Sequence, residues 1–243
     1  QRLDMVHQHW SEALEEDPEV ERRLQAEVQR LGEEYLVAMK AQIFTSTVQG
    51  DAASVQECLR RGTSPHNLNN KGNTPLFVAA HLGHASVVSA LMAAGADSAC
   101  RTEDEGLTPL IEAAGNNHAH AVRALLGGKA DPNLKTNAGT TAIMASALKG
   151  YFQPLQALLA DERCDLNLGN SVGATALHLA AFAEKAPCVA LLLKHGASTK
   201  IRVKSGKLEG RRAKEVAEEE ATLQAFKDHK KSILAMAAGL FRS

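Results

Sequence analysis

The sequence predicts an all-α solenoid, in which helix–turn–helix units stack in a row, short β-hairpin loops connect them and capping helices precede them. Three observations favour this fold class. The threonines of a recurring motif are 33 or 34 residues apart, which indicates a repeat architecture. Apolar residues make up 44% of the chain but aromatic residues only 4%, which favours closely packed Ala- and Leu-rich helices over a β-sandwich. Apolar residues at helical spacing also precede the first repeat.

Composition and charge exclude several classes of protein. Charged residues make up 23% of the 243 residues, so the apolar content is high enough to oppose chain entropy and a disordered chain is not expected. The formal net charge is −1, which provides no field for collecting nucleic acid. No run approaches the roughly 18 apolar residues of a membrane span, so no integral membrane segment is expected.

Localisation is inferred from the first residues, which are polar and begin with Gln1 rather than Met. They do not have the charged start and apolar run of a signal peptide. We expect a cytoplasmic protein. The alternative is a periplasmic or secreted one, if a signal peptide was removed before Gln1.

Residues 1–39 are expected to form an N-terminal helical cap. Apolar spacings of three and four predict an amphipathic helix over residues 18–40, with Asp17 as cap and Pro18 as first residue. A shorter apolar set around Trp10 predicts another helix before it. We expect these helices to cover the first repeat, because solenoid ends need a cover; the alternative is that they dock a partner. The apolar residues of the longer helix are Val20, Leu24, Val28, Leu31, Tyr35, Leu36 and Met39.

Residues 40–227 are expected to form the repeat domain, which begins with a degenerate repeat over Ile43 to Pro65. In the four clear repeats, a threonine can cap the first helix by accepting a free amide, and Pro or Ala suits the first helical position. An Ala-rich pair lets neighbouring helices approach, and glycines supply positive φ at the turns. Lys129 and Arg163 stand where repeat two has Gly95, so those turns are expected to differ in shape. The four motifs are Gly72–Leu76, Gly106–Leu110, Gly139–Ile143 and Gly173–Leu177.

The C-terminal part is expected to close the row. Ala213 to Phe226 has the pattern of a truncated helix pair, and the segment from Lys204 to Arg212 makes the last hairpin longer than the others. A tail over residues 228–243 follows. With Lys227 it contains basic residues and then apolar ones, so it could lie on a membrane surface or act as a peptide ligand, but packing on the last repeat is expected.

The 33-residue period, the Thr-Pro-Leu motif after Gly72 and Gly106, and the Gly83-His84 pair at a fixed phase resemble the ankyrin repeat family. The resemblance implies a curved slab whose concave side consists of hairpin tips and first helices, and exposed positions there carry recognition. It also implies that His84, His118 and His178 form structural hydrogen bonds.

The expected partner-binding residues are those that occupy these exposed positions in each repeat, counted along the 33-residue period. Five of them are apolar (Leu82, Leu107, Leu148, Val172 and Phe182), which predicts a contact patch unless the chain's own ends cover it. His81 is expected to be exposed on the first helix of repeat two. The remaining ten are Asn70, Lys71, Asn73, Asp104, Glu105, Asn116, Asn137, Thr140, Lys149 and Ser171. Ala183 maps to the same surface in repeat five, and Val48 and Gln49 of repeat one fit it less clearly.

No catalytic, cofactor-binding or metal-binding residues are expected. The sequence contains no glycine-rich phosphate loop and no Gly-x-Ser-x-Gly elbow. His118 and His120 have a spacing that is poor for one metal on a helix, and the four cysteines are interpreted as buried fillers. The acidic run at Glu103 to Glu105 is interpreted as a solvated hairpin tip.

These patterns predict a non-catalytic module that binds another protein on its concave face, with no small-molecule substrate. One alternative is a dedicated inhibitor or immunity protein that blocks the active site of a partner enzyme. Another is a regulatory fragment of a larger enzyme. Tight binding that abolishes an enzyme's turnover would distinguish the inhibitor.

Overall fold

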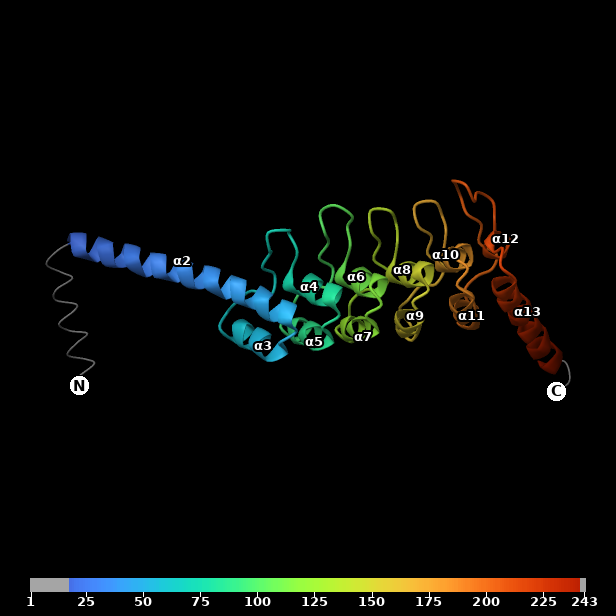
Figure 1. The fold of residues 1–243 in the computed structure, drawn as a ribbon, viewed down its shortest axis with the longest axis horizontal. Coiled ribbons are helices and arrows are strands. Elements are labelled where there is room, and N and C mark those ends of the chain that lie inside the picture. The colour runs from blue at the N-terminus through green and yellow to red at the C-terminus, as the bar shows by residue number, and fades with distance from the viewer. Residues whose placement is uncertain (1–17, 241–243) are drawn as a thin grey trace.

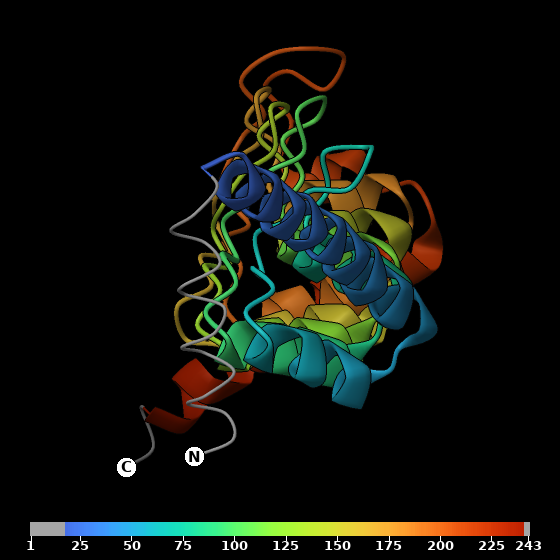
Figure 2. The same ribbon diagram turned by 90° about the vertical axis from the view of Figure 1, so that its left-hand side faces the viewer.

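The computed structural model describes residues 18–240, which contain twelve helices. Helix pairs stack side by side in one row, and hairpin loops project from one edge of it (Figure 1). Viewed along the row, the hairpins stand off to one side of two helical layers (Figure 2). The inner helices, next to the hairpins, are α4 (Pro75–Leu82), α6 (Pro109–Gly115), α8 (Ala142–Lys149) and α10 (Ala176–Phe182). The outer helices are α3 (Ala52–Arg60), α5 (Ala85–Ala93), α7 (Ala119–Gly127), α9 (Phe152–Leu159) and α11 (Ala186–Lys194). The predicted helical solenoid is confirmed.

The predicted threonine caps begin the inner helices. The Thr74 hydroxyl accepts a hydrogen bond from the Phe77 amide at 3.2 Å, and Thr108 accepts one from Ile111 at 3.3 Å. Thr175 instead bonds the ring of His178. Thr74 and Thr108 therefore fix the point at which the chain leaves a hairpin and becomes helical. Thr141 stands at the same point before α8, but its buried hydroxyl forms no hydrogen bond within residues 18–240, so the predicted side-chain cap is missing there.

Small residues allow the row to be compact. The Ala pairs of α4 and α6 are fully buried, as are large side chains such as Leu125 in α7 and Leu158 in α9. Neighbouring inner helices and neighbouring outer helices contact one another all along the row. Because each unit buries its apolar face only against the next unit, the core is continuous from Met39 to Phe226.

The N-terminal helix differs from the expected cap. Helix α2 (Pro18–Gln49) is one continuous helix that crosses the expected boundary at residue 39, and its last turns serve as the first helix of repeat one. Met39 and Ile43 are buried there, but Leu31 is 52% exposed and Val28 is also exposed. Figure 1 shows α2 projecting beyond α3 and the rest of the row. The projecting part therefore does not cover the first repeat, and the shorter helix expected before it lies outside the described residues.

The C-terminal end closes the row as a short sixth unit. Helix α12 (Ala213–Val216) packs on α10, and α13 (Glu220–Leu240) packs on α11, so the expected capping pair is present. Helix α13 continues through residue 228, where the tail was expected to begin. None of the helices in the described part of the chain is long and apolar enough to cross a bilayer.

The hairpin loops and turns differ from expectation in two details. Residues 18–240 contain no β-strand, only one bridge between Arg202 and Arg212. A typical hairpin closes with two backbone bonds around one residue, such as Thr136 N to Thr140 O and Gly139 N to Thr136 O, which are too few to make a strand pair. Lys129 adopts a left-handed φ of 67°, close to the 80° of Gly95, so that turn keeps its shape. The turn at Arg163 does differ, because the Asp161 carboxylate accepts hydrogen bonds from the Arg163 amide and guanidinium.

Candidate functional site

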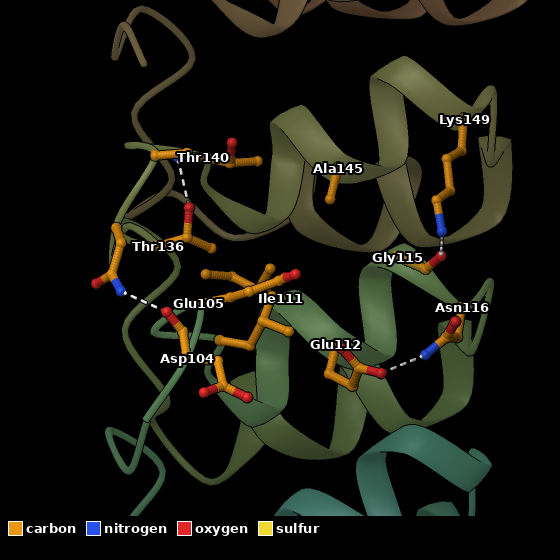
Figure 3. A pocket seen from close by; sticks show the side chains of 13 residues that line it. Asp104, Glu105, Ile111, Glu112, Gly115, Asn116, Thr136, Thr140, Ala145 and Lys149 are labelled. Carbon is orange, nitrogen blue, oxygen red and sulfur yellow. Dashed lines mark hydrogen bonds between the residues drawn. The ribbon is translucent and has the colours of Figure 1, made fainter. Parts of the chain in front are cut away.

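The inner wall, formed by the hairpins and the inner helices, contains a groove of about 620 Å³ between repeats three and four (Figure 3). Leu107, Ile111 and Ala145 provide its apolar surface. Ile111 and Ala145 lie on the neighbouring helices α6 and α8, and Leu107 lies at the base of the hairpin before α6. The groove brings together seven of the predicted residues: Asp104, Glu105, Leu107, Asn116, Asn137, Thr140 and Lys149.

The hairpin end of the groove is acidic and held in place by its neighbour. Asn137 donates its side-chain amide to the Asp104 carbonyl at 3.0 Å, and its backbone amide donates to the Glu105 carbonyl at 2.9 Å. The carboxylates of Asp104 and Glu105 belong to exposed residues and form no ion pair within residues 18–240. Asn137 therefore positions two free negative charges at the mouth of the groove.

The helical end of the groove carries a polar network centred on Glu112. Its Oε1 lies 2.7 Å from His81 Nδ1 and accepts a hydrogen bond of 2.8 Å from Asn116 Nδ2. Lys149 Nζ donates to the Gly115 carbonyl at 2.7 Å and lies 5.9 Å from the Tyr151 ring centroid. Glu112 was not among the residues predicted from the sequence. It precedes the predicted residue Asn116 by four positions, about one helical turn, and this spacing places the two residues on the same face of a helix.

The predicted apolar patch is present in part. Leu82, Leu148 and Phe182, which are 38%, 40% and 59% exposed, lie at the C-terminal ends of α4, α8 and α10. In helix α6 the repeat position of Leu148 and Phe182 is taken by Gly115, whereas Leu82 occupies the following repeat position, which in α6 is Asn116. Val172 is exposed on a hairpin rather than on a helix, and Leu107 is half-buried in the groove. Leu148 and Phe182 therefore share one position on the neighbouring helices α8 and α10, and Leu82, Leu107 and Val172 occupy other positions of the repeat.

A family model for ankyrin repeats, in three copies, matches residues 43–136 and 116–203. These matches span more than half of the chain and cover the helix pairs described above. The chain belongs to the ankyrin repeat family. A comparison with curated proteins found no significant match. Ankyrin repeats are generally protein–protein interaction modules and are typically non-catalytic.

The remaining predicted residues of the ankyrin inner wall lie on hairpins. The Asn69 side chain accepts hydrogen bonds from the backbone amides of Lys71 and Asn73, which shapes the hairpin of repeat two. Lys71 and its neighbour Asn70 are exposed at this tip, and Asn73 is half-buried. The exposed Ser171 donates its backbone amide to the Ala138 carbonyl at 3.1 Å.

Three histidines of the ankyrin pattern form the hydrogen bonds expected of them. His84 Nε2 lies 3.1 Å from the Val48 carbonyl, and His118 Nε2 lies 2.9 Å from the His81 carbonyl, so each ring links two consecutive repeats. His178 Nδ1 lies 2.9 Å from the Thr175 hydroxyl. Burial lowers the pKa of His178, and the nearby backbone of Arg211 and Ile201 opposes the shift only in part.

The expectation that the four cysteines are buried holds for two of them, and Cys100 and Cys164 are only half-buried. All four are free thiols, and Cys58 and Cys188 are buried. Burial raises the pKa of Cys164 to about 12, and the neighbouring carboxylates of Asp161 and Asp165 add to the shift. Such thiols are poor nucleophiles at neutral pH. Within residues 18–240 no cluster of three or more His, Cys, Asp or Glu side chains could hold a metal ion.

Proposed function

We propose that this ankyrin repeat protein is a non-catalytic module that binds a protein partner on its concave inner wall. The observation that carries the proposal is the groove of about 620 Å³ between two repeats, whose apolar lining consists of half-buried Leu107 and Ala145 above the buried Ile111. Exposed Leu148, on α8 itself, and Phe182, on the following inner helix α10, add apolar side chains to this wall. An apolar centre with a polar rim is the composition of a protein interface.

The charges around the groove favour a particular kind of partner segment. Asp104 and Glu105 place two carboxylates at the hairpin end, and Glu112 places a third at the helical end. Lys149 is held on the Gly115 carbonyl beside Glu112, so the hairpin end stays acidic. A partner segment with an apolar side chain for the groove and a Lys or Arg for its hairpin end would complement both features.

The groups around the groove support binding rather than catalysis. The Glu112 carboxylate already accepts a hydrogen bond from Asn116 and contacts His81, and Asp104 and Glu105 are solvated. Thr136 and Thr140 are bonded to each other across their hairpin. A nucleophile paired with an oriented base does not occur among these described groups, so we propose no reaction for the site.

The test is affinity capture from an extract of the native cell with the wild-type protein and two double variants. Leu82→Glu with Leu148→Glu places charges on the inner wall, and we expect it to lose the captured partner while the thermal midpoint stays close to wild type. Leu36→Glu with Val37→Glu adds the same charge on the exposed part of α2 and should retain the partner. Equal capture by both variants would contradict the proposal, and a large fall in midpoint would show that the wall residues belong to the core.

The inhibitor hypothesis is tested with the same captured partner. If the partner is an enzyme, its turnover is measured with increasing amounts of the wild-type protein. The interaction module predicts that activity persists at saturation, whereas an inhibitor would abolish it. No observation on the described residues favours the inhibitor, so the module is the function proposed.

A further inference from the structure

A second cleft, of about 680 Å³, lies at the C-terminal end of the row, opposite the projecting helix α2. It forms where α12 and α13 meet the turn that follows α11, away from the groove between repeats three and four. Three separate segments therefore contribute its side chains. They are Thr199, Arg212, Lys214, Glu215, Phe226, Lys227, His229, Lys230 and Lys231.

This end of the molecule is basic although the whole chain is nearly neutral. Residues 194–231 contain eleven Lys and Arg but only six Asp and Glu, whereas the full chain has a net charge of −1. Five Lys or Arg side chains line the cleft, and Glu215 is the one carboxylate among the described lining residues. The positive charge is thus concentrated around a concave surface, where it acts on a ligand more strongly than scattered charge would.

The carboxylates nearby neutralise only part of this charge. Glu220 pairs with Lys227 at 2.7 Å, and Glu215 lies 3.6 Å from Arg202 and 3.9 Å from Arg212. Lys214, Lys230 and Lys231 form no ion pair or hydrogen bond within residues 18–240. Like charges gathered in one cleft repel one another, and a multivalent anion would relieve that repulsion.

We propose that this cleft binds a compact anion that carries two or more phosphate groups. Neutralising the three ammonium groups that have no partner takes several negative charges on one ligand. Phosphate groups supply such charges and are strong hydrogen-bond acceptors for lysine. The volume of the cleft lies within the range of sites that enclose small ligands. The site is separate from the protein-binding groove and does not depend on the proposed function.

Such an anion could be a free polyphosphorylated molecule or the headgroup of a phosphorylated lipid. In sequence, Lys230 and Lys231 are followed on α13 by Ile233, Leu234 and Met236. A basic segment beside apolar residues on one helix is typical of contact with an anionic membrane surface. The experiment therefore presents the phosphate groups in both forms.

Titration calorimetry with inositol hexakisphosphate measures the free form, and sedimentation with vesicles that contain phosphatidylinositol 4,5-bisphosphate measures the lipid form. The full chain is compared with Lys214→Glu/Lys230→Glu, in which two partnerless cations of the cleft are reversed. Lys194→Glu/Lys207→Glu makes the same change of net charge at exposed residues outside the cleft. Poly-glutamate serves as a polyanion without phosphate, and all measurements are made at 150 mM salt.

We expect the wild type to bind at least one phosphate probe, the cleft variant to bind at least tenfold more weakly, and the control variant to stay within twofold of wild type. Binding only to the soluble probe identifies a free phosphate as the source, and binding only to vesicles identifies a lipid headgroup. Equal losses in both variants would overturn the proposal, because they indicate general electrostatic attraction. Absence of binding to both probes, or equal affinity for poly-glutamate, would also overturn it.

Discussion

Individual glycines at the hairpin tips let successive hairpins contact one another. Gly139 has a left-handed φ of 78°, and a Cβ atom there would lie 2.7 Å from the backbone nitrogen of Ser171 in the next hairpin. Gly95 also has a left-handed φ, of 80°, but a Cβ atom there would meet nothing within 4 Å. The two glycines therefore share a conformation and differ in their surroundings.

This difference predicts the effect of alanine at the two positions. Gly95→Ala should cost about 1–2 kcal/mol of unfolding free energy, the price of a left-handed alanine. Gly139→Ala should cost more, because the hairpin of repeat five must also shift. Urea unfolding of both variants measures the difference, and equal losses would show that the hairpins do not pack as described.

His178 gives the stability a specific dependence on pH. Its pKa in the folded protein lies below the ordinary value of 6.5, so the unfolded chain takes up the proton first as the pH falls. The contribution is fully present above pH 6.5 and decreases as the pH falls from 6.5 toward the folded pKa. We expect wild type to lose more unfolding free energy between pH 6.5 and 5.5 than His178→Gln loses.

The exposed His120 on α7 provides the matched control for this pH effect. His120→Gln should follow the wild-type curve in urea unfolding at pH 7.5, 6.5 and 5.5. If the unfolding free energy of His178→Gln fell as steeply as that of wild type between pH 6.5 and 5.5, His178 would be excluded as the source of the pH dependence.

At the scale of elements, the projecting helix α2 is the largest departure from the other repeats. Its apolar residues at spacings of three and four predicted an amphipathic helix, and the helix is present. The same pattern is compatible with a helix that covers the first repeat and with a helix whose apolar face is exposed. Amphipathicity does not specify what packs against the apolar face. Among the side chains of α2 that the structure describes, Met39 is the first buried one, and there α2 becomes the first helix of repeat one.

The two parts of α2 should respond differently to truncation of a side chain. Leu31→Ala, in the exposed part, should change the unfolding free energy by less than about 0.5 kcal/mol. Ile43 is fully buried, and Ile43→Ala should cost about 2–5 kcal/mol by leaving a cavity. Thermal and urea unfolding measure both, and a large loss for Leu31→Ala would mean that this segment packs on the protein.

Residues whose role repeats in every unit could be predicted from the sequence, and residues whose role depends on the neighbouring unit could not. Thr74 and Thr108 cap their helices as the motif predicted. Asn137 was expected to face a partner, but it holds the hairpin of repeat three, and Glu112 gained its role only through His81 of repeat two. Lys129 shows that a left-handed turn persists without glycine when the rest of the unit fixes it.

At the scale of the whole molecule, the stacked helix pairs form a repeated packing framework that carries two surfaces of different chemistry. The inner wall offers an apolar groove with carboxylates at its hairpin end, and the C-terminal end offers a basic cleft. Because each repeat contacts only its neighbours, a substitution that adds a charge to one of these surfaces should not change the structure or the binding of the other.

The central claim, that the inner wall binds a protein, is tested most directly by amide hydrogen exchange of the protein with and without its captured partner. We predict that the partner slows exchange at the hairpin tips, around Asp104 and Ala138, and leaves the outer helices α5, α7 and α9 unchanged. Slowed exchange confined to the outer helices or to α2, with the hairpin tips unaffected, would contradict the account.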